Sequence, residues 1–275
     1  MPAGRAVRHS DDMGSHDVLE LLARADAAEA LPRLGGMARP NGVVIVSERH
    51  WAFASVDGAI GEGVLPRRRG AMARLPLVRG LVRLSTSLAP LLRGRGVARG
   101  RERMLLLAAL VVPFGFVALP GRWSLVAGIA ITFALIVALF RGRTLRLHGA
   151  EHRAIAAAEE RRLVESWAGI ARPSRFAARC GTNFAAIAVP VTVGLQAVWP
   201  FAPEIWTPAV VMVAALALSM EVWLVVQGRR ALRPLLLPGL ALQRLTTREP
   251  SLEDTRVALA AVASVLRREL EVNRC

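Results

Sequence analysis

Long runs of apolar residues that are almost free of charge dominate the chain between residues 104 and 227. Four such runs lie at 104–120, 123–140, 184–199 and 207–227; short connections join the first to the second and the third to the fourth, and the longer segment 141–183 separates the two pairs. A helix needs about 20 mostly apolar residues to cross a bilayer, so the second and fourth runs are long enough and the other two are slightly short. The pattern predicts a mainly α, integral membrane fold with four transmembrane helices, paired as two helical hairpins at 104–140 and 184–227.

The other segments are polar, and their periodicities predict a small cytoplasmic α+β portion. Residues 1–16 carry no apolar stretch and are predicted to form a disordered extension. Residues 17–103 are predicted to hold a helix, a β-hairpin at 43–56 and a basic amphipathic helix, which either lies in the membrane interface or packs on the cytoplasmic portion. The connection 141–183 and the tail 228–275, with its amphipathic C-terminal helix, complete this portion.

Charge decides the orientation of these helices. The chain has 36 basic and 21 acidic residues, a net charge of +15, and every basic residue is arginine, a composition typical of a GC-rich bacterial genome. All arginines except Arg122 lie outside the two short hairpin connections, so the positive-inside rule places both termini in the cytoplasm. We therefore expect a multi-pass protein of the bacterial inner membrane, N-in and C-in, which contacts membrane lipid rather than nucleic acid.

The segment His-Gly-Ala-Glu-His at 148–152 carries the clearest candidate chemistry. Positions i, i+3 and i+4 share a helix face, so His148, Glu151 and His152 would project together. Two neutral imidazoles can bind Zn²⁺, and a neighbouring glutamate can take a proton from water. The alternative is that the two histidines flank the cytoplasmic end of the second membrane helix, where they bind backbone carbonyls or lipid headgroups.

A catalytic zinc usually has a third protein ligand, and Cys180 is the best candidate for it. Arg179 and a helix N-terminus would lower the pKa of the Cys180 thiol, so a reactive thiolate without a metal is a second interpretation. A small buried hydrophobic side chain is a third. Glu221 lies inside the fourth apolar run, where an acid is costly, and is a candidate metal ligand or ion-pair partner of an arginine at the membrane boundary.

Three sequence motifs follow one another along the chain: His-Gly-Ala-Glu-His-Arg at 148–153, Arg-Cys-Gly-Thr-Asn-Phe at 179–184 and Gln-Arg-Leu-Thr-Thr-Arg-Glu-Pro at 243–250. In this order they resemble the YqhQ-like membrane proteins, a family catalogued as a domain of unknown function and sometimes described as predicted metal-dependent enzymes. The resemblance covers about residues 34–265 and implies one cytoplasmic site, with Thr182 as a further candidate beside Cys180. The residues of this implied site would be His148, Glu151, His152, Cys180, Thr246, Thr247, Arg248 and Glu249.

The chain departs from the family pattern in two places. Arg39-Pro40-Asn41 stands where the family usually has a glutamate, and Ala177 stands where it tends to have a histidine before Arg-Cys-Gly-Thr. If that histidine is a ligand in the relatives, this chain has lost it, which favours a non-catalytic role.

The leading hypothesis is a membrane-bound, metal-dependent, hydrolase-like enzyme with zinc as the expected metal. His148, His152 and Cys180 would bind the metal. Glu151 would act as the base, and Arg248 would bind an anionic group of a substrate that the sequence does not identify. The alternative is a non-enzymatic scaffold or assembly factor whose arginine-rich face binds a protein, anionic lipid or RNA. A transporter with so few helices would need to be a homo-oligomer.

Overall fold

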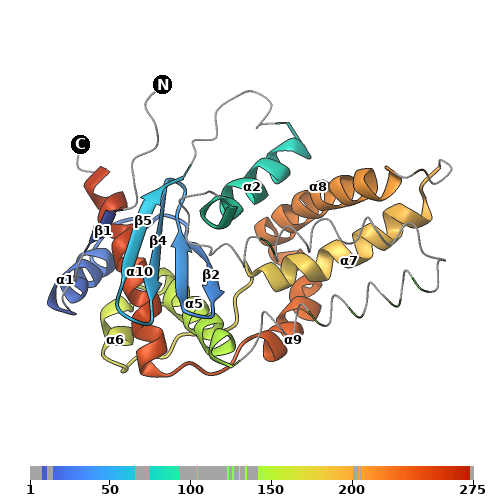
Figure 1. The fold of residues 1–275 in the computed structure, drawn as a ribbon. Helices are drawn as coiled ribbons and strands as arrows, with labels where there is room; N and C mark the ends of the chain where they lie inside the picture. The colour runs from blue at the N-terminus through green and yellow to red at the C-terminus, as the bar shows by residue number, and fades with distance from the viewer. Residues whose placement is uncertain are drawn as a thin grey trace.

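The computed structural model describes residues 8–10, 15–65, 75–92, 142–200, 204 and 206–272, together with the isolated positions 104, 123, 126, 130 and 134. Two parts can be distinguished in the described residues. One is a β-sheet covered by helices, which we call the sheet domain, and the other is a group of apolar helices that extends away from it (Figure 1).

An antiparallel sheet of five strands forms the centre of the sheet domain. Its order is β1–β5–β4–β3–β2, and the strands are β1 (Arg8–Ser10), β2 (Gly35–Arg39), β3 (Gly42–Val46), β4 (His50–Ser55) and β5 (Ile60–Val64). β-Branched and aromatic residues favour β3 and β4, which pair with Val44 opposite Phe53. The predicted hairpin at 43–56 is therefore part of a larger sheet, and β1 lies within the segment predicted to be disordered.

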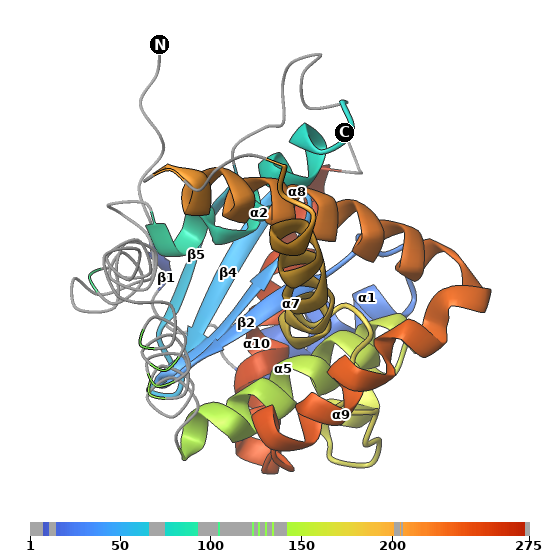
Figure 2. The ribbon, with the colours of Figure 1, turned by 90° about the vertical axis from the view of Figure 1, so that its right-hand side faces the viewer.

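Two long helices cover one face of this sheet (Figure 2). α5 (Arg143–Glu159) packs against β2 and β3, while α10 (Leu252–Val272) packs against β3, β4 and α5. α1 (Ser15–Asp26) and the short α6 (Leu163–Trp167) pack on α10 in turn. The core between sheet and helices is apolar and buried, and it includes Val43, Ile45, Leu147, Leu259 and Leu266.

A buried acid also ties the sheet to α10. Glu62 on β5 accepts hydrogen bonds from the Ser264 hydroxyl at 3.0 Å and from the Arg267 guanidinium at 2.7 Å, and it pairs with Arg268. Burial of a carboxylate is costly unless it is paired, so these contacts fix the register of α10 on the sheet. The position of α10 matters because the segment that precedes it contributes to the candidate site.

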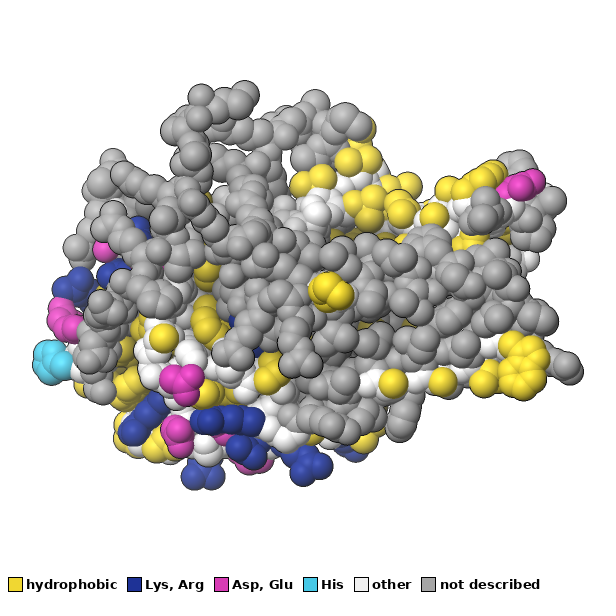
Figure 3. Space-filling view, in the orientation of Figure 1, with side chains coloured by type: hydrophobic (Ala, Val, Ile, Leu, Met, Phe, Trp, Pro, Cys, Tyr) yellow, Lys and Arg dark blue, Asp and Glu magenta, His cyan; other side chains and the backbone are white. Residues whose placement is uncertain are grey.

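The apolar helices begin and end at the sheet domain. α7 (Gly181–Ala197) runs away from the domain and α8 (Thr207–Gly228) lies beside it, followed by the 3₁₀-helix η3 (Arg230–Leu236) and α9 (Leu237–Thr246), which lead back to α10. α2 (Val78–Leu92) lies on α8, with Gly80 against Met220. Charged side chains gather over the sheet domain and hydrophobic ones over α2 and α8 (Figure 3).

The prediction of a mainly α fold with four transmembrane helices is wrong. Within the described residues, one helix, α8 with 22 residues, is long and apolar enough to cross a membrane. The third run forms α7, whose 17 residues span about 26 Å, less than the bilayer core of roughly 30 Å. The runs at 104–120 and 123–140 lie outside the described residues apart from isolated positions. Among the described residues, the length of an apolar run therefore overestimated the number of helices that are long enough to span a bilayer.

Candidate metal centre

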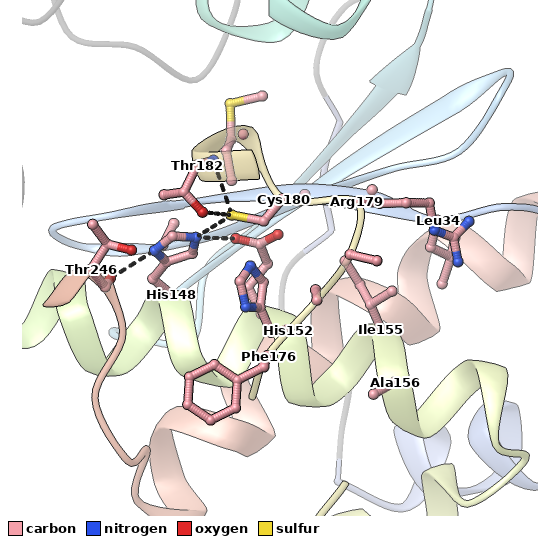
Figure 4. Close-up of a pocket in the computed structure, with 18 of the residues that line it drawn as sticks. Leu34, His148, His152, Ile155, Ala156, Phe176, Arg179, Cys180, Thr182 and Thr246 are labelled. Carbon is pink, nitrogen blue, oxygen red and sulfur yellow. Dashed lines mark hydrogen bonds and ion pairs between the residues drawn. The ribbon is translucent and has the colours of Figure 1, made fainter. Parts of the chain in front are cut away.

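Three side chains that can bind a metal converge where the sheet domain meets α7. His148 and His152 lie one turn apart on the buried face of α5, with ring centroids 4.5 Å apart. Cys180 is the N-cap residue of α7, and its sulphur accepts hydrogen bonds from the backbone N–H and the hydroxyl of Thr182. The ligand atoms of these three side chains all lie within 4.8 Å of one another (Figure 4).

Backbone carbonyls fix the orientation of both imidazoles. Nδ1 of His148 lies 2.8 Å from the Thr246 carbonyl, and Nδ1 of His152 lies 2.6 Å from the Arg175 carbonyl. A carbonyl oxygen only accepts hydrogen bonds, so Nδ1 carries the proton in each ring and Nε2 has the lone pair. Histidine ligands of metals are commonly held in this way through the nitrogen that does not bind the ion.

The Nε2 atoms of the two histidines face the cluster. Nε2 of His148 lies 3.4 Å from Sγ of Cys180, while Nε2 of His152 is buried without a hydrogen-bond partner among the described residues. A buried nitrogen without a partner is unfavourable, and a metal ion would satisfy it. Burial lowers the pKa of His148, and burial together with the charge of His148 lowers the pKa of His152 to about 4. Both rings are therefore neutral at pH 7, the form that binds metals.

The environment of Cys180 differs from the expectation drawn from sequence. Burial, and next the nearby Glu151 carboxyl, raise the pKa of the Cys180 thiol to about 11, although the hydrogen bonds from Thr182 oppose this shift. The Arg179 guanidinium pairs with Glu159 and is not among the groups that shift the pKa of the thiol. An activated thiolate that works without a metal is therefore not favoured, since the thiolate needs a cation to form at pH 7.

Glu151 lies beside the cluster and is held by the sheet. The residue is 4% exposed, Oε2 lies 4.0 Å from Nε2 of His148, and the backbone N–H of Ala38 on β2 donates to its carboxyl. Gly36 on the same strand makes room for it, because a Cβ there would lie 2.8 Å from Cγ of Glu151. Burial raises the pKa of Glu151 to about 8. The carboxyl is thus poised to exchange a proton near neutral pH.

The donor set and its spacing fit a zinc ion. Zinc prefers nitrogen and sulphur ligands in a tetrahedron, in which neighbouring ligand atoms lie about 3.5 Å apart. The His148–Cys180 pair already has this spacing, and the widest pair would close by roughly 1 Å. The three side chains line a cavity of about 570 Å³ that is otherwise mostly apolar, so a fourth coordination position would face this space.

The other residues predicted for the site are placed differently. Thr182 and Thr246 line the cavity, whereas the Thr247 hydroxyl is buried and donates to the Gln243 carbonyl. Arg248 is exposed and is not part of the cavity wall, and Glu249 pairs with Arg153 at 2.7 Å. Glu221 lies on α8 and accepts from Arg79 at 2.5 Å and from the backbone N–H of Leu77, so it fastens α2 to α8 and does not join the cluster.

Two buried amides that support the site were not singled out from sequence. Gln243 is fully buried and bridges the backbone N–H and carbonyl of Ala177, and Asn183 donates to the same carbonyl at 2.8 Å. These amides hold the segment before Cys180, which includes Ala177 in the cavity wall. Both belong to quoted motifs, at 243–250 and 179–184, but spacing alone gave no reason to assign them this role.

The fold and the cluster define a class of protein: an α+β domain with a buried histidine–cysteine centre at its junction with apolar helices. The chain belongs to the family described as "Protein of unknown function (DUF1385)", whose model matches residues 116–268. It is similar to the "Uncharacterized protein YqhQ" of Bacillus subtilis (strain 168), with 33% identity over 134 residues. This match covers 46% of the chain and 42% of that relative, so it spans less than half of either protein. The resemblance noted from the motifs is thereby confirmed, and no solved structure matches.

Proposed function

We propose that this chain is a metal-dependent, hydrolase-like enzyme. His148, His152 and Cys180 hold a divalent metal, with zinc as the ion that suits these donors best. The observation that carries the proposal is the pair of anchored imidazoles: each donates Nδ1–H to a backbone carbonyl and turns Nε2 toward the Cys180 sulphur. A structural role would not require the costly burial of an unpartnered Nε2 on His152.

The residues around the cluster have separate parts in the proposed reaction. A divalent cation at this place supplies Lewis-acid polarisation of a substrate oxygen, and its charge favours the ionised forms of Cys180 and Glu151. Glu151, in the ionised form that the cation would favour, takes a proton from an attacking water and passes it to the leaving group. The apolar walls of the cavity exclude bulk water from these steps.

We further propose that α7 and α8 enter the bacterial inner membrane from the cytoplasmic side. α8 is long and apolar enough to cross a membrane, and Val210, Val213, Leu218 and Val225 are exposed on it. α7 starts and α8 ends at the sheet domain, so the two helices form one hairpin with the site at its base (Figure 1). The hairpin crosses the membrane, because a bilayer thins locally around a helix that is a few Å too short, as α7 is. The arginine-rich sheet domain then lies on the cytoplasmic side, as the positive-inside rule requires.

The enzymatic part of the proposal is tested in cells of the source bacterium. The chromosomal gene is replaced by a copy that carries Glu151→Gln, which keeps the size of the side chain and removes the base. Lipids and small metabolites of the two strains are then compared by mass spectrometry. We expect at least one species to accumulate in the Glu151→Gln strain, because the substrate is no longer consumed.

Glu160→Gln is the matched control, since Glu160 is an exposed acid at the end of the same helix. This strain should have the wild-type profile. Identical profiles in all three strains, at equal protein levels, would speak against an enzyme and in favour of a non-enzymatic scaffold.

A further inference from the structure

A second hollow adjoins the metal cavity. It has a volume of about 740 Å³ and lies between the segment before β2, the end of α5, the C-terminal end of α8 and η3. The two hollows share the wall residues Leu34, Glu159, Ala178 and Arg179. Figure 4 shows Leu34 and Arg179 next to each other on the opposite side of the metal cavity from Thr246. A molecule in one hollow could therefore reach into the other.

The walls of this second hollow are strongly basic. Among the described residues, four arginines and one glutamate line it: Arg33, Arg161, Arg179, Arg233 and Glu159. Arg161 is held by the carbonyls of Ala25 and Glu29, and Glu159 pairs with Arg179. The formal charge of the wall is thus +3. The C-terminal end of α8 contributes only about half a negative charge through its helix dipole, so the arginines dominate.

The positive charges of two of these arginines, Arg33 and Arg179, repel each other. Burial lowers the pKa of Arg179, and the positive charge of Arg33 lowers it further. The fold thus brings like charges from distant parts of the chain to one hollow, at a cost in stability that a bound anion would remove. The planar guanidinium forms paired hydrogen bonds with phosphate, so several arginines around one hollow match the oxygens of a phosphate group.

The surroundings indicate what the phosphate is attached to. The metal cavity has largely apolar walls, with Leu34, Met37, Ile155, Phe176 and Leu242 among them. Both hollows lie where the sheet domain meets α7 and α8, the apolar helices. A molecule that fits both hollows has an anionic group for the arginines and an apolar part for the adjoining walls.

We propose that the hollow lined by Arg33, Arg179 and Arg233 binds the phosphate group of a lipid-like amphiphile, and that the metal cavity receives the adjoining part of this molecule. That the amphiphile is a substrate rests on the proposed function, whereas its binding rests on the basic hollow alone. The arginines act as binding residues and leave the chemistry to the metal centre.

Binding is measured on the full chain in a nonionic detergent with EDTA, by titration with short-chain dihexanoyl phosphatidic acid, dihexanoyl phosphatidylcholine or inorganic phosphate. We expect phosphatidic acid to bind about tenfold more tightly than inorganic phosphate, because apolar contacts add to the ionic ones. Phosphatidylcholine, whose phosphate carries a bulky cation, should bind weakly. Arg33→Gln/Arg233→Gln should weaken the binding of phosphatidic acid by about tenfold or more.

The matched control is Arg24→Gln/Arg162→Gln, which also removes two positive charges but from exposed ion pairs away from the hollow. Its affinity for phosphatidic acid should equal that of the wild type. If the Arg33→Gln/Arg233→Gln protein has a lower melting temperature than the wild type, the affinities of the two single variants are compared with that of the wild type instead. Because the titrations contain EDTA, the affinity for phosphatidic acid is measured without a metal, so loss of the metal centre and loss of the anion site are separate results.

Three outcomes would overturn the proposal. Equal affinities for phosphatidic acid and inorganic phosphate would indicate a soluble phosphate compound instead of an amphiphile. If the control variant and Arg33→Gln/Arg233→Gln lose the same affinity for phosphatidic acid, the lipid is attracted to the basic surface as a whole and not to this hollow. Absence of binding to either phosphate compound would show that the hollow is not an anion site.

Discussion

Two backbone carbonyls decide which nitrogen each histidine presents to the cavity. The carbonyl of Arg175 belongs to the segment before α7, and that of Thr246 to the end of α9, so the two rings are anchored by separate parts of the chain. Cys180 is held in turn by the first turn of α7. Each ligand is thus oriented by a neighbour that does not bind the ion, which lowers the entropy lost when a metal binds.

The raised pKa of Glu151 predicts how the stability of the metal-free protein depends on pH. The carboxyl has an ordinary pKa of 4.5 and a pKa of about 8 in the folded chain, so the folded state holds its proton more tightly than the unfolded state. Its contribution to stability is complete below the unfolded pKa and is lost as the pH rises through about 8. Between pH 4 and 6.5, the lowered pKa of His152 has the opposite effect, so the Glu151 contribution is seen alone above pH 6.5.

We therefore expect the EDTA-treated wild type to lose about 1 to 2 kcal/mol of unfolding free energy between pH 6.5 and 8. Glu151→Gln cannot ionise and should show a smaller loss over the same range. Thermal melting in detergent at several pH values measures the difference. Parallel curves for the two proteins would show that the carboxyl is not held protonated by burial.

Glycines determine how closely the elements around the site approach one another. Gly149 on α5 faces the segment that leads into α10: a Cβ at Gly149 would lie 2.2 Å from the Arg248 carbonyl oxygen, and the Arg248 N–H donates to the Leu145 carbonyl on α5. This crossing also places Thr246 beside His148. The helix and the segment can only dock this closely because position 149 has no side chain.

Gly149→Ala should therefore destabilise the protein by about 1 to 3 kcal/mol, since a backbone carbonyl cannot rotate away as a side chain can. It should also weaken metal binding, because the carbonyl that orients His148 is displaced. Gly194→Ala on α7 is the control, as no atom of the described residues lies within 4 Å of a Cβ there. Denaturant unfolding of both variants tests this, and equal stability of Gly149→Ala and Gly194→Ala would contradict the close crossing.

The sequence predicted some elements of the site well. The i, i+3, i+4 spacing of His148, Glu151 and His152 placed these side chains on one helix face, and α5 presents them so. The contact of this face with Cys180 could only be suggested from the order of the motifs, because it joins residues 32 positions apart. The support of Glu151 by Gly36 and Ala38 could not be predicted, since it depends on how β2 packs on α5.

At the scale of the whole molecule, the apolar helices between residues 181 and 228 were expected from the sequence, but the five-stranded sheet of the N-terminal part was not. β1, β2 and β5 lack the alternation of apolar and polar residues that identifies strands, and they are short and rich in glycine or polar residues. Their pairing is decided by contacts with β3, β4 and the two covering helices, which a local pattern does not contain. The fold was therefore expected to be more helical than it is.

The proposed placement of α7 and α8 in the membrane predicts the location of two points of the chain. Alkaline phosphatase fused after residue 203, between the two helices, should be active, because it would lie in the periplasm. The same enzyme fused after residue 272, at the end of α10, should be inactive, because it would lie in the cytoplasm. An inactive fusion at residue 203, at equal expression, would place the turn between the helices on the cytoplasmic side and contradict the proposed hairpin.

The metal content of the purified protein tests the central proposal most directly. The full chain is purified in detergent beside His148→Ala/His152→Ala and the control His16→Ala, whose imidazole is exposed on α1, and metals are determined by mass spectrometry after reconstitution with zinc, manganese or iron. We expect about one equivalent of a transition metal, zinc being preferred, in the wild type and in His16→Ala, and none in the double variant. Absence of metal from the wild type, or equal amounts in all three proteins, would contradict the metal centre and favour a scaffold.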